Sequence, residues 1–453
     1  MEINEIPTRR SNPFKPKKNS WKRIKSLVKP TLQKYPVIDT AVVKIWRAGR
    51  FFVLKSKWKL NALVGSWVGS RVSKIDVDKI YWISPNKIVF SSLKEFNLHD
   101  FKGKILGGDW DRLEKRFDTL DLYIAIKKVC VEGKKWAETD YYQYALEDIK
   151  KGRLMLDESE RDLEMECKKI ESLYQSIQHD GYISQKELFI AGQIQDPKVA
   201  EEEVTVSIGR FGDLLFSDGA HRLAIAKLLG VPTIPVKIAV RHKNWIEFRN
   251  ELVHYGQDTP ITKDKNLYQS VTHPDLSDLP AAHLCEDRFQ LIKDNTAVRQ
   301  GFLLDIGANL GYFCHRFEEI GLDCYAVENH LPTVYFLERL ARAENRKFKI
   351  ITESVFVNPE IRNIRFNIVL ALNVFHHFLK THEDFDKLVD LLKNLQMDEL
   401  FFEPHLPNDP QMQDAYKNYS PDEFVKLITS NSKLKTAVLL SVMEDGRPLY
   451  KIC

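Results

Sequence analysis

The chain has 453 residues, of which 43% are hydrophobic and 29% are charged, a composition typical of a folded protein with two or three domains. No apolar run approaches the roughly 20 residues that a membrane-spanning helix requires, and no apolar stretch follows the basic N-terminus as it does in a secretory signal. The six cysteines form no CxxC pair, so we expect reduced thiols and a cytoplasmic location.

Positive charge is concentrated at the N-terminus. Residues 1–74 carry 18 Lys and Arg against three acidic residues, a net charge of +15, whereas the remaining 379 residues carry 49 basic and 60 acidic residues, a net charge of −11. We therefore expect residues 1–73 to form a basic extension. Such an extension indicates an anionic partner, which can be nucleic acid, anionic lipid or the acidic surface of the same protein.

Residues 74–255 are predicted to form a central α+β domain. A long amphipathic helix is expected from Glu158 to His179. Strands are expected at 203–208, 213–217 and 234–240. The stretch SDGAHRLAIAKLLGV predicts a turn followed by a helix. A helix start that carries Asp218, Gly219, His221 and Arg222 offers backbone N–H groups and donor side chains, so we expect an anion to bind there.

The same turn resembles the signature of the ParB/sulfiredoxin-like fold. The resemblance is distinctive over residues 207–236 and implies that Gly219, His221 and Arg222 contact the phosphates of a nucleotide such as ATP or CTP. Ala220 stands where sulfiredoxins hold their reactive cysteine, which excludes repair of sulfinic acids. Two alternatives remain open: a small-molecule kinase whose base is Asp109, Asp111 or Glu138, and a purely structural turn in which His221 and Arg222 pair with nearby acids.

Residues 256–290 contain prolines and few periodic apolar positions, so we expect a linker. From residue 291 to 453, strand and helix patterns alternate as in a parallel, doubly wound Rossmann-like sheet. The whole chain is thus expected to be an α/β multidomain protein.

The stretch FLLDIGANLGYF (302–313) predicts a buried strand, a glycine turn and a helix. Gly307 and Gly311 allow the backbone to approach a ligand closely, and the N-terminus of the following helix favours a carboxylate. Twenty-three residues after Asp305, the next strand pattern ends in Glu328, a carboxylate suited to two ribose hydroxyls. The Gly-x3-Gly spacing differs from the GxGxxG of nicotinamide cofactor sites.

This stretch resembles the class I methyltransferases that use S-adenosylmethionine (SAM). The resemblance covers about 150 residues. It implies that Asp305, Gly307 and Asn309 border the methionine end of SAM and that Glu328 binds the ribose, with Gly311 a further cofactor-binding residue. It further implies that Glu353 or Ser354 lies near the adenine, with Asn373 beside the methyl group.

Catalytic residues are expected at the ends of the fourth and fifth strands, because this architecture places its chemistry there. The candidates are Glu403, His405 and His376, which can act as a base if the acceptor is protonated. His376, His377 and His405 lack tight ligand spacing, so we predict no metal site.

The sequence therefore predicts a SAM-dependent methyltransferase fused to a nucleotide-binding domain. The segment NVFHH after the fourth strand differs from the tetrapeptide of enzymes that methylate DNA bases. The acceptor can still be a small molecule, a sugar or RNA. The alternative is a nucleotide-binding switch, a nucleic-acid adaptor or a small-molecule kinase whose methyltransferase domain only senses SAM.

Overall fold

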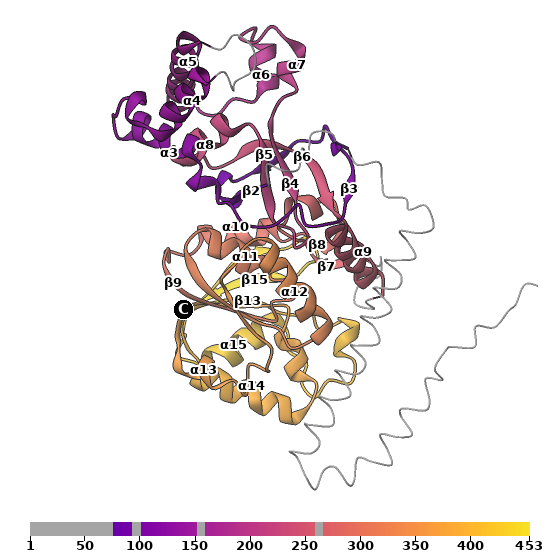
Figure 1. The fold of residues 1–453 in the computed structure, drawn as a ribbon. Helices are drawn as coiled ribbons and strands as arrows, with labels where there is room; N and C mark the ends of the chain where they lie inside the picture. The colour runs from indigo at the N-terminus through magenta and orange to yellow at the C-terminus, as the bar shows by residue number, and fades with distance from the viewer. Residues whose placement is uncertain (1–75, 93–100, 152–158, 259–265) are drawn as a thin grey trace, which may run out of the picture. The chain divides into compact units, whose positions relative to one another are not determined.

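The computed structural model describes residues 76–92, 101–151, 159–258 and 266–453. The predicted basic extension lies outside these residues. Two sheets organise the described chain, one in a middle module (76–258) and one in a C-terminal module (266–453) (Figure 1).

The middle module is built on a six-stranded mixed sheet with the order β1-β6-β4-β5-β2 and β3 paired with β6. Its strands are β1 (Tyr81–Ile83), β2 (Phe90–Ser91), β3 (Ile105–Leu106), β4 (Val204–Ile208), β5 (Leu214–Asp218) and β6 (Ile234–His242). Its helices are α3 (Asp121–Ile126), α4 (Asp140–Lys150), α5 (Glu160–Asp180), α6 (Gln185–Ile190), α7 (Pro197–Ala200), α8 (Ala220–Leu228) and α9 (Lys243–Asp258).

Three predicted strands of this module are confirmed as β4, β5 and β6, and the long predicted helix is α5. Helix α5 begins at a capping box, in which the Ser159 hydroxyl accepts from the backbone of Asp162 and the Asp162 carboxylate accepts from Ser159. The order of the sheet does not by itself identify the ParB/sulfiredoxin-like fold.

The C-terminal module contains a seven-stranded sheet with the order β11-β10-β9-β12-β13-β15-β14. Its strands are β9 (Gly301–Ile306), β10 (Leu322–Val327), β11 (Lys349–Ile351), β12 (Arg365–Leu372), β13 (Gln396–Glu403), β14 (Ala437–Val442) and β15 (Pro448–Ile452). Neighbouring strands from β11 to β13 are parallel, and β15 is antiparallel to both β13 and β14. The predicted doubly wound sheet is therefore confirmed, with the reversed β15 near one edge.

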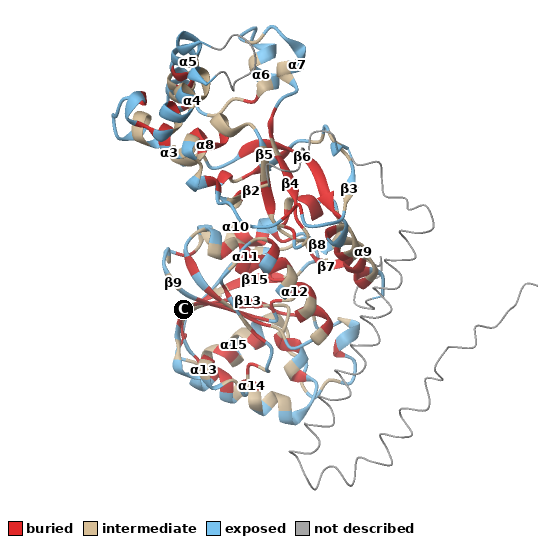
Figure 2. Ribbon diagram, viewed as in Figure 1, coloured by how far each residue is buried: buried red, intermediate tan, exposed pale blue. Residues whose placement is uncertain are grey.

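Helices cover both faces of this sheet (Figure 1). They are α10 (Glu286–Asp294), α11 (Tyr312–Glu319), α12 (Leu331–Ala343), α13 (Pro359–Asn363), α14 (His382–Asn394) and α15 (Pro421–Asn431). One buried apolar cluster joins the sheet to α10, α11 and α12, with Phe289, Phe317 and Leu337 at its centre. A second cluster joins the other face to α13, α14 and α15. The central strands β9, β12 and β13 are buried on both sides over most of their length as a result (Figure 2), which explains their continuous apolar sequences, whereas β14 is largely exposed.

The strand order switches sides between β9 and β12, which are parallel neighbours. β9 leads through α11 to β10 on one side, while the later strands build outward from β12 on the other side. In such sheets ligands bind outside the carboxyl ends of the strands at this switch point. The ends of β9, β10 and β12 therefore mark where a site is to be sought.

The described part of the region predicted as a linker contains several short elements of regular structure. It contains the end of α9, the parallel pair β7 (Leu267–Gln269) and β8 (Ala281–His283), and the start of α10. Gln269 and His273 are buried. Strands of three residues carry too little periodicity to be recognised from sequence.

Among the described residues, no helix is long and apolar enough to span a membrane. The same residues contain no group of three or more His, Cys, Asp or Glu side chains that could hold a metal ion.

Candidate cofactor site

The turn between β9 and α11 follows a path that only glycine tolerates at two positions. Gly307 has φ +78°, and a Cβ atom there would lie 2.7 Å from Cγ2 of Val374. Gly311, the residue before α11, has φ +82°, and a Cβ atom there would meet Leu337. Asn309 lies between them with φ 53°, a conformation that Asn adopts more readily than most residues. The turn is thus held against its neighbours with no room for a side chain at Gly307 or Gly311.

Glu328 faces this turn from the end of β10. Its Oε2 accepts a hydrogen bond of 3.1 Å from the backbone N–H of Asn309, and its Oε1 accepts one of 2.8 Å from the N–H of His330. Burial raises the pKa of Glu328, and these N–H groups oppose the shift. The predicted turn and the predicted acid therefore lie face to face.

Both groups line a cavity of about 400 Å³. Its other walls come from the ends of β11 and β12 and from the 3-10 helix Phe375–Leu379. They include Asn329, Thr333, Ser354, Val355, Asn373, Val374, His376, His377 and Gln411. The side-chain oxygens of Asn309 and Asn373 are buried without a hydrogen-bond partner. Buried acceptors normally have partners, so these two oxygens indicate a ligand that donates hydrogen bonds.

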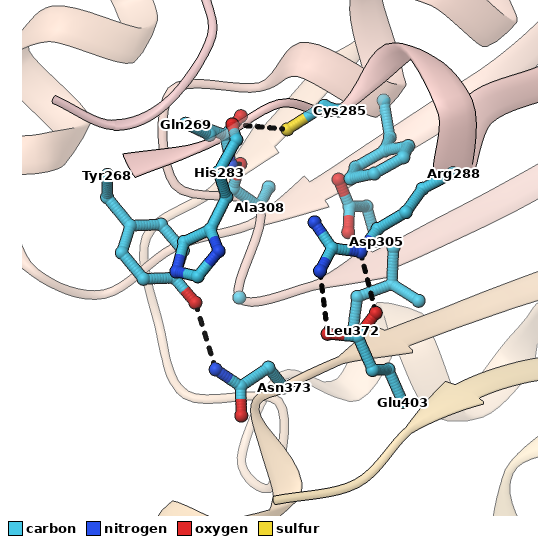
Figure 3. A pocket seen from close by; sticks show the side chains of 12 residues that line it. Tyr268, Gln269, His283, Cys285, Arg288, Asp305, Ala308, Leu372, Asn373 and Glu403 are labelled. Carbon is cyan, nitrogen blue, oxygen red and sulfur yellow. Dashed lines mark hydrogen bonds and ion pairs between the residues drawn. The ribbon is translucent and has the colours of Figure 1, made fainter. Parts of the chain in front are cut away.

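A second, smaller chamber of about 40 Å³ adjoins the cavity. The two share Tyr268, Gly307, Leu372 and Asn373. Figure 3 shows the Tyr268 hydroxyl facing the Asn373 amide, whose Nδ2 donates to it over 3.1 Å. These shared residues form the junction between the two spaces.

The smaller chamber is lined by ionisable side chains. Asp305 is 3% exposed, and burial, with the charge of Glu328, raises its pKa to about 7. Arg288 of α10 donates to Glu403 from Nε over 2.7 Å and from Nη2 over 3.3 Å, as Figure 3 shows. Burial raises the pKa of Glu403, and Arg288 opposes this shift. Two acids and one guanidinium thus surround a space large enough for a few atoms.

Gln269 supports the glycine turn from β7. Its Oε1 accepts from the backbone N–H of Tyr312 over 2.9 Å, and its Nε2 donates to the carbonyl oxygen of Ala308 over 3.2 Å. The first N–H of α11 is therefore already bonded within the protein. Gln269 occupies only this donor, so the expectation that the helix N-terminus favours the methionine carboxylate stays a prediction for the N–H groups that follow.

Tyr268, Gln269 and Arg288 were missed by the sequence analysis. All three belong to the segment predicted as a linker. A signal for Arg288 existed in the apolar spacing of EDRFQLIKD, which forms α10 and buries one face, whereas Tyr268 and Gln269 lie in the short strand β7. The chamber that they line could not be read from that spacing.

The catalytic candidates lie in three different environments. His376 lines the large cavity; burial, with neighbouring His377, lowers its pKa to about 3. Glu403 lines the small chamber and is paired with Arg288. His405 is buried, with Nε2 3.0 Å from Oδ1 of Asn418, and it lines neither space. The structure therefore brings His376 and Glu403 to the site and places His405 behind it.

The predicted nucleotide turn of the middle module has the expected backbone. Gly219 has φ +85° and precedes α8. Asp218 accepts from the Gly219 N–H over 2.7 Å. Arg222, however, donates to the carbonyl oxygen of Glu202 over 2.5 Å and lies 3.4 Å from the Glu203 carboxylate, and His221 lies 3.9 Å from Glu166. These contacts favour the structural interpretation of the turn.

Two of the three acids considered as kinase bases, Asp109 and Asp111, also have structural partners. Asp111 forms a two-pronged ion pair with Arg210, which in addition donates to Asp109 over 2.8 Å. Such pairs hold the loop 107–111 against the turn at Gly209 and need no substrate to explain them.

No protein-family model matches the sequence, and no curated protein matches it either. Solved structures that match part of the chain include the bifunctional kinase-methyltransferase WbdD (20% identity, 45% of this chain and 45% of that chain, TM-score 0.37), so the match spans less than half the length of that protein. They also include magnesium protoporphyrin IX methyltransferase from Synechocystis PCC 6803 with bound SAM (14% identity, 37% of this chain and 76% of that chain, TM-score 0.28). Identities and TM-scores this low do not establish a shared activity.

Proposed function

We propose that the C-terminal module is a SAM-dependent methyltransferase. The observation that carries this proposal is the pair of adjoining spaces at the carboxyl ends of β9, β10 and β12. The large cavity has the Glu328 carboxylate opposite the glycine turn, and the small chamber is lined by charged side chains. SAM has the same two parts, a nucleoside and a zwitterionic amino acid, joined at a sulfonium.

The large cavity suits the nucleoside. Glu328 can accept hydrogen bonds from two ribose hydroxyls, and the unpartnered oxygen of Asn309 is a further acceptor beside it. Ser354 and Val355, after β11, line the part of the cavity where adenine is expected. A cavity of about 400 Å³ lies within the size range of small-molecule sites.

The small chamber suits the amino-acid end. Arg288 offers a guanidinium to a carboxylate, and Asp305 and Glu403 offer acidic oxygens to an ammonium group. A bound ammonium would favour the ionised form of Asp305, which burial now disfavours. We therefore assign Glu403 to the binding and orientation of the cofactor instead of to proton transfer.

Bound SAM would supply a methyl group on a sulfonium, which an acceptor attacks in line. The chain would contribute orientation and exclusion of water, because the junction at Tyr268, Leu372 and Asn373 fixes both halves of the cofactor. His376 is uncharged at neutral pH. Its low pKa makes it a weak general base, so we expect it to accept a hydrogen bond from the acceptor without taking the proton.

The wall beyond Asn373 favours an uncharged acceptor group. Burial lowers the pKa of His377 to about 4, so both imidazoles on this wall are neutral, and Gln411 beside them is neutral as well. A hydroxyl fits this wall, and small molecules, sugars and RNA all carry hydroxyls.

Calorimetry on the full chain tests the proposal with two ligands, SAM and methylthioadenosine, which lacks the amino-acid end. We expect SAM to bind more tightly than methylthioadenosine and NAD not to bind. Arg288→Lys should lower the affinity for SAM by roughly tenfold or more, because a charged bidentate hydrogen bond is lost. The affinity for methylthioadenosine should change little. Arg365→Lys, at the exposed amino end of β12, is the matched control. Equal losses for both ligands would contradict the assignment of the chamber.

Transfer of labelled methyl from SAM to hydroxyl compounds then distinguishes an enzyme from a SAM sensor. Turnover with any acceptor supports the enzyme, and tight SAM binding without turnover across small molecules, sugars and RNA supports the sensor.

A further inference from the structure

Helix α9 of the middle module packs along α12 of the C-terminal module. The rings of Tyr255 and Phe336 lie 4.7 Å apart, and those of Phe248 and Phe336 lie 6.0 Å apart. The Tyr335 hydroxyl donates to Glu251 over 2.6 Å. This contact matters for the site because α12 begins three residues after Glu328.

A chain of hydrogen bonds runs from α9 to the acid of the cavity. The hydroxyls of Tyr255 and Thr333 lie 2.8 Å apart, and both side chains belong to buried residues. Oγ1 of Thr333 lies 2.8 Å from Nδ1 of His330. The N–H of His330 then donates to Glu328 over 2.8 Å.

All members of this chain except Tyr255 line the large cavity. In one direction of this chain, Tyr255 donates to Thr333, which donates to Nδ1 of a neutral His330. Hydrogen bonds in series strengthen one another. The packing of the Tyr255 ring on Phe336 holds the Tyr255 hydroxyl in place at the end of the chain that is far from Glu328.

We infer that Tyr255 is a positioning residue for the cofactor site, so that the site is completed by the middle module. Tyr255 fixes Thr333 and His330, and His330 holds the Glu328 carboxylate in the orientation that faces the glycine turn. The role of Glu328 toward ribose rests on the proposed function, whereas the positioning of His330 does not.

The experiment compares Tyr255→Phe with Tyr335→Phe in the full chain. Each variant loses one hydroxyl from the same helix pair and keeps its ring, but only Tyr255 is linked to Glu328. The first measurement is hydrogen exchange of the peptide that contains the His330 amide, in protein without ligand. The second is the dissociation constant of SAM by calorimetry, with thermal melting to compare stabilities.

We expect Tyr255→Phe to speed hydrogen exchange of the His330 amide. It should also raise the dissociation constant of SAM by about 3- to 10-fold, the effect of losing one neutral hydrogen bond. Tyr335→Phe should leave both measurements near those of the unchanged protein. Thr333→Val should match Tyr255→Phe, and the double variant should add little to Thr333→Val because both remove the same link.

The inference is overturned if Tyr255→Phe leaves exchange at His330 unchanged or if Tyr335→Phe has the same effect. If the unchanged protein does not bind SAM, the proposed function fails, and the exchange comparison still decides whether Tyr255 positions His330.

Discussion

Asp305→Asn should stabilise the protein without ligand and weaken its binding of SAM. The reason is that burial disfavours the ionised form of Asp305, which we expect a bound ammonium group to favour. Burial, with the charge of Glu328, raises the pKa of Asp305 from 3.8 to about 7. At 1.36 kcal/mol per unit, keeping this group ionised in the folded protein costs about 4 kcal/mol. A neutral amide removes that cost.

The sign follows from the raised pKa. The folded state binds the proton more tightly than the unfolded state, so stability falls as the pH rises from about 4 to about 7 and the whole cost is present at pH 8. The NH2 group of the introduced asparagine would not find partners for both of its N–H donors in the chamber, which costs about 1–2 kcal/mol of folding stability. We expect a net gain of about 2 kcal/mol at pH 8, a rise in melting temperature of roughly 4–8 °C.

The assay is thermal melting at pH 8 and pH 5, together with SAM calorimetry. Asp305→Asn should melt higher at pH 8, show a smaller gain at pH 5 and bind SAM roughly 10- to 100-fold more weakly, because a charge-assisted hydrogen bond is lost. Asp323→Asn, an exposed position on β10, is the matched control. A variant that melts lower at pH 8, or that binds SAM as well as the unchanged protein, would refute this reasoning.

Three further predictions concern other parts of the module. Gly307→Ala should abolish detectable SAM binding in calorimetry, because its Cβ would meet Val374 in a backbone region that alanine avoids; retained affinity would show that the turn is not part of the site. Burial opposes the charge of Glu344, but neighbouring cations, Lys87 of the middle module among them, hold its pKa well below its ordinary value. Glu344→Gln should therefore cost about 2–4 kcal/mol in urea unfolding at pH 7, and the loss should shrink as the pH falls below about 4, where unfolded glutamate takes up its proton. His405→Ala should lower stability but leave the dissociation constant of SAM unchanged, and a weaker SAM complex would return His405 to the site.

The glycine turn, the acid at the next strand end and the alternation of strands and helices up to β13 were accessible from the sequence. Each depends on local chemistry: a buried parallel strand is a continuous apolar run, and a turn at positive φ needs glycine. Residues that follow such strands meet at one edge of the sheet, so Asp305, Glu328 and Asn373 could be placed near one another before the structure was known.

The charged chamber was not accessible, because its residues are distant in sequence. Arg288 and Glu403 are 115 positions apart and meet only when α10 packs beside β13. The same limit applies to the middle module. The sequence indicated an anion site at Arg222, but in the folded chain the guanidinium of Arg222 lies 3.4 Å from the Glu203 carboxylate, which is distant in sequence.

The sequence by itself thus determined the cofactor turn and the class of sheet, since both arise from the periodicity and conformational preferences of adjacent residues. Only the tertiary structure decided which charges share a chamber and that Tyr255 of another module reaches the cavity. Burial and pairing change the chemistry of a side chain through neighbours brought together by packing, and no local pattern records those neighbours.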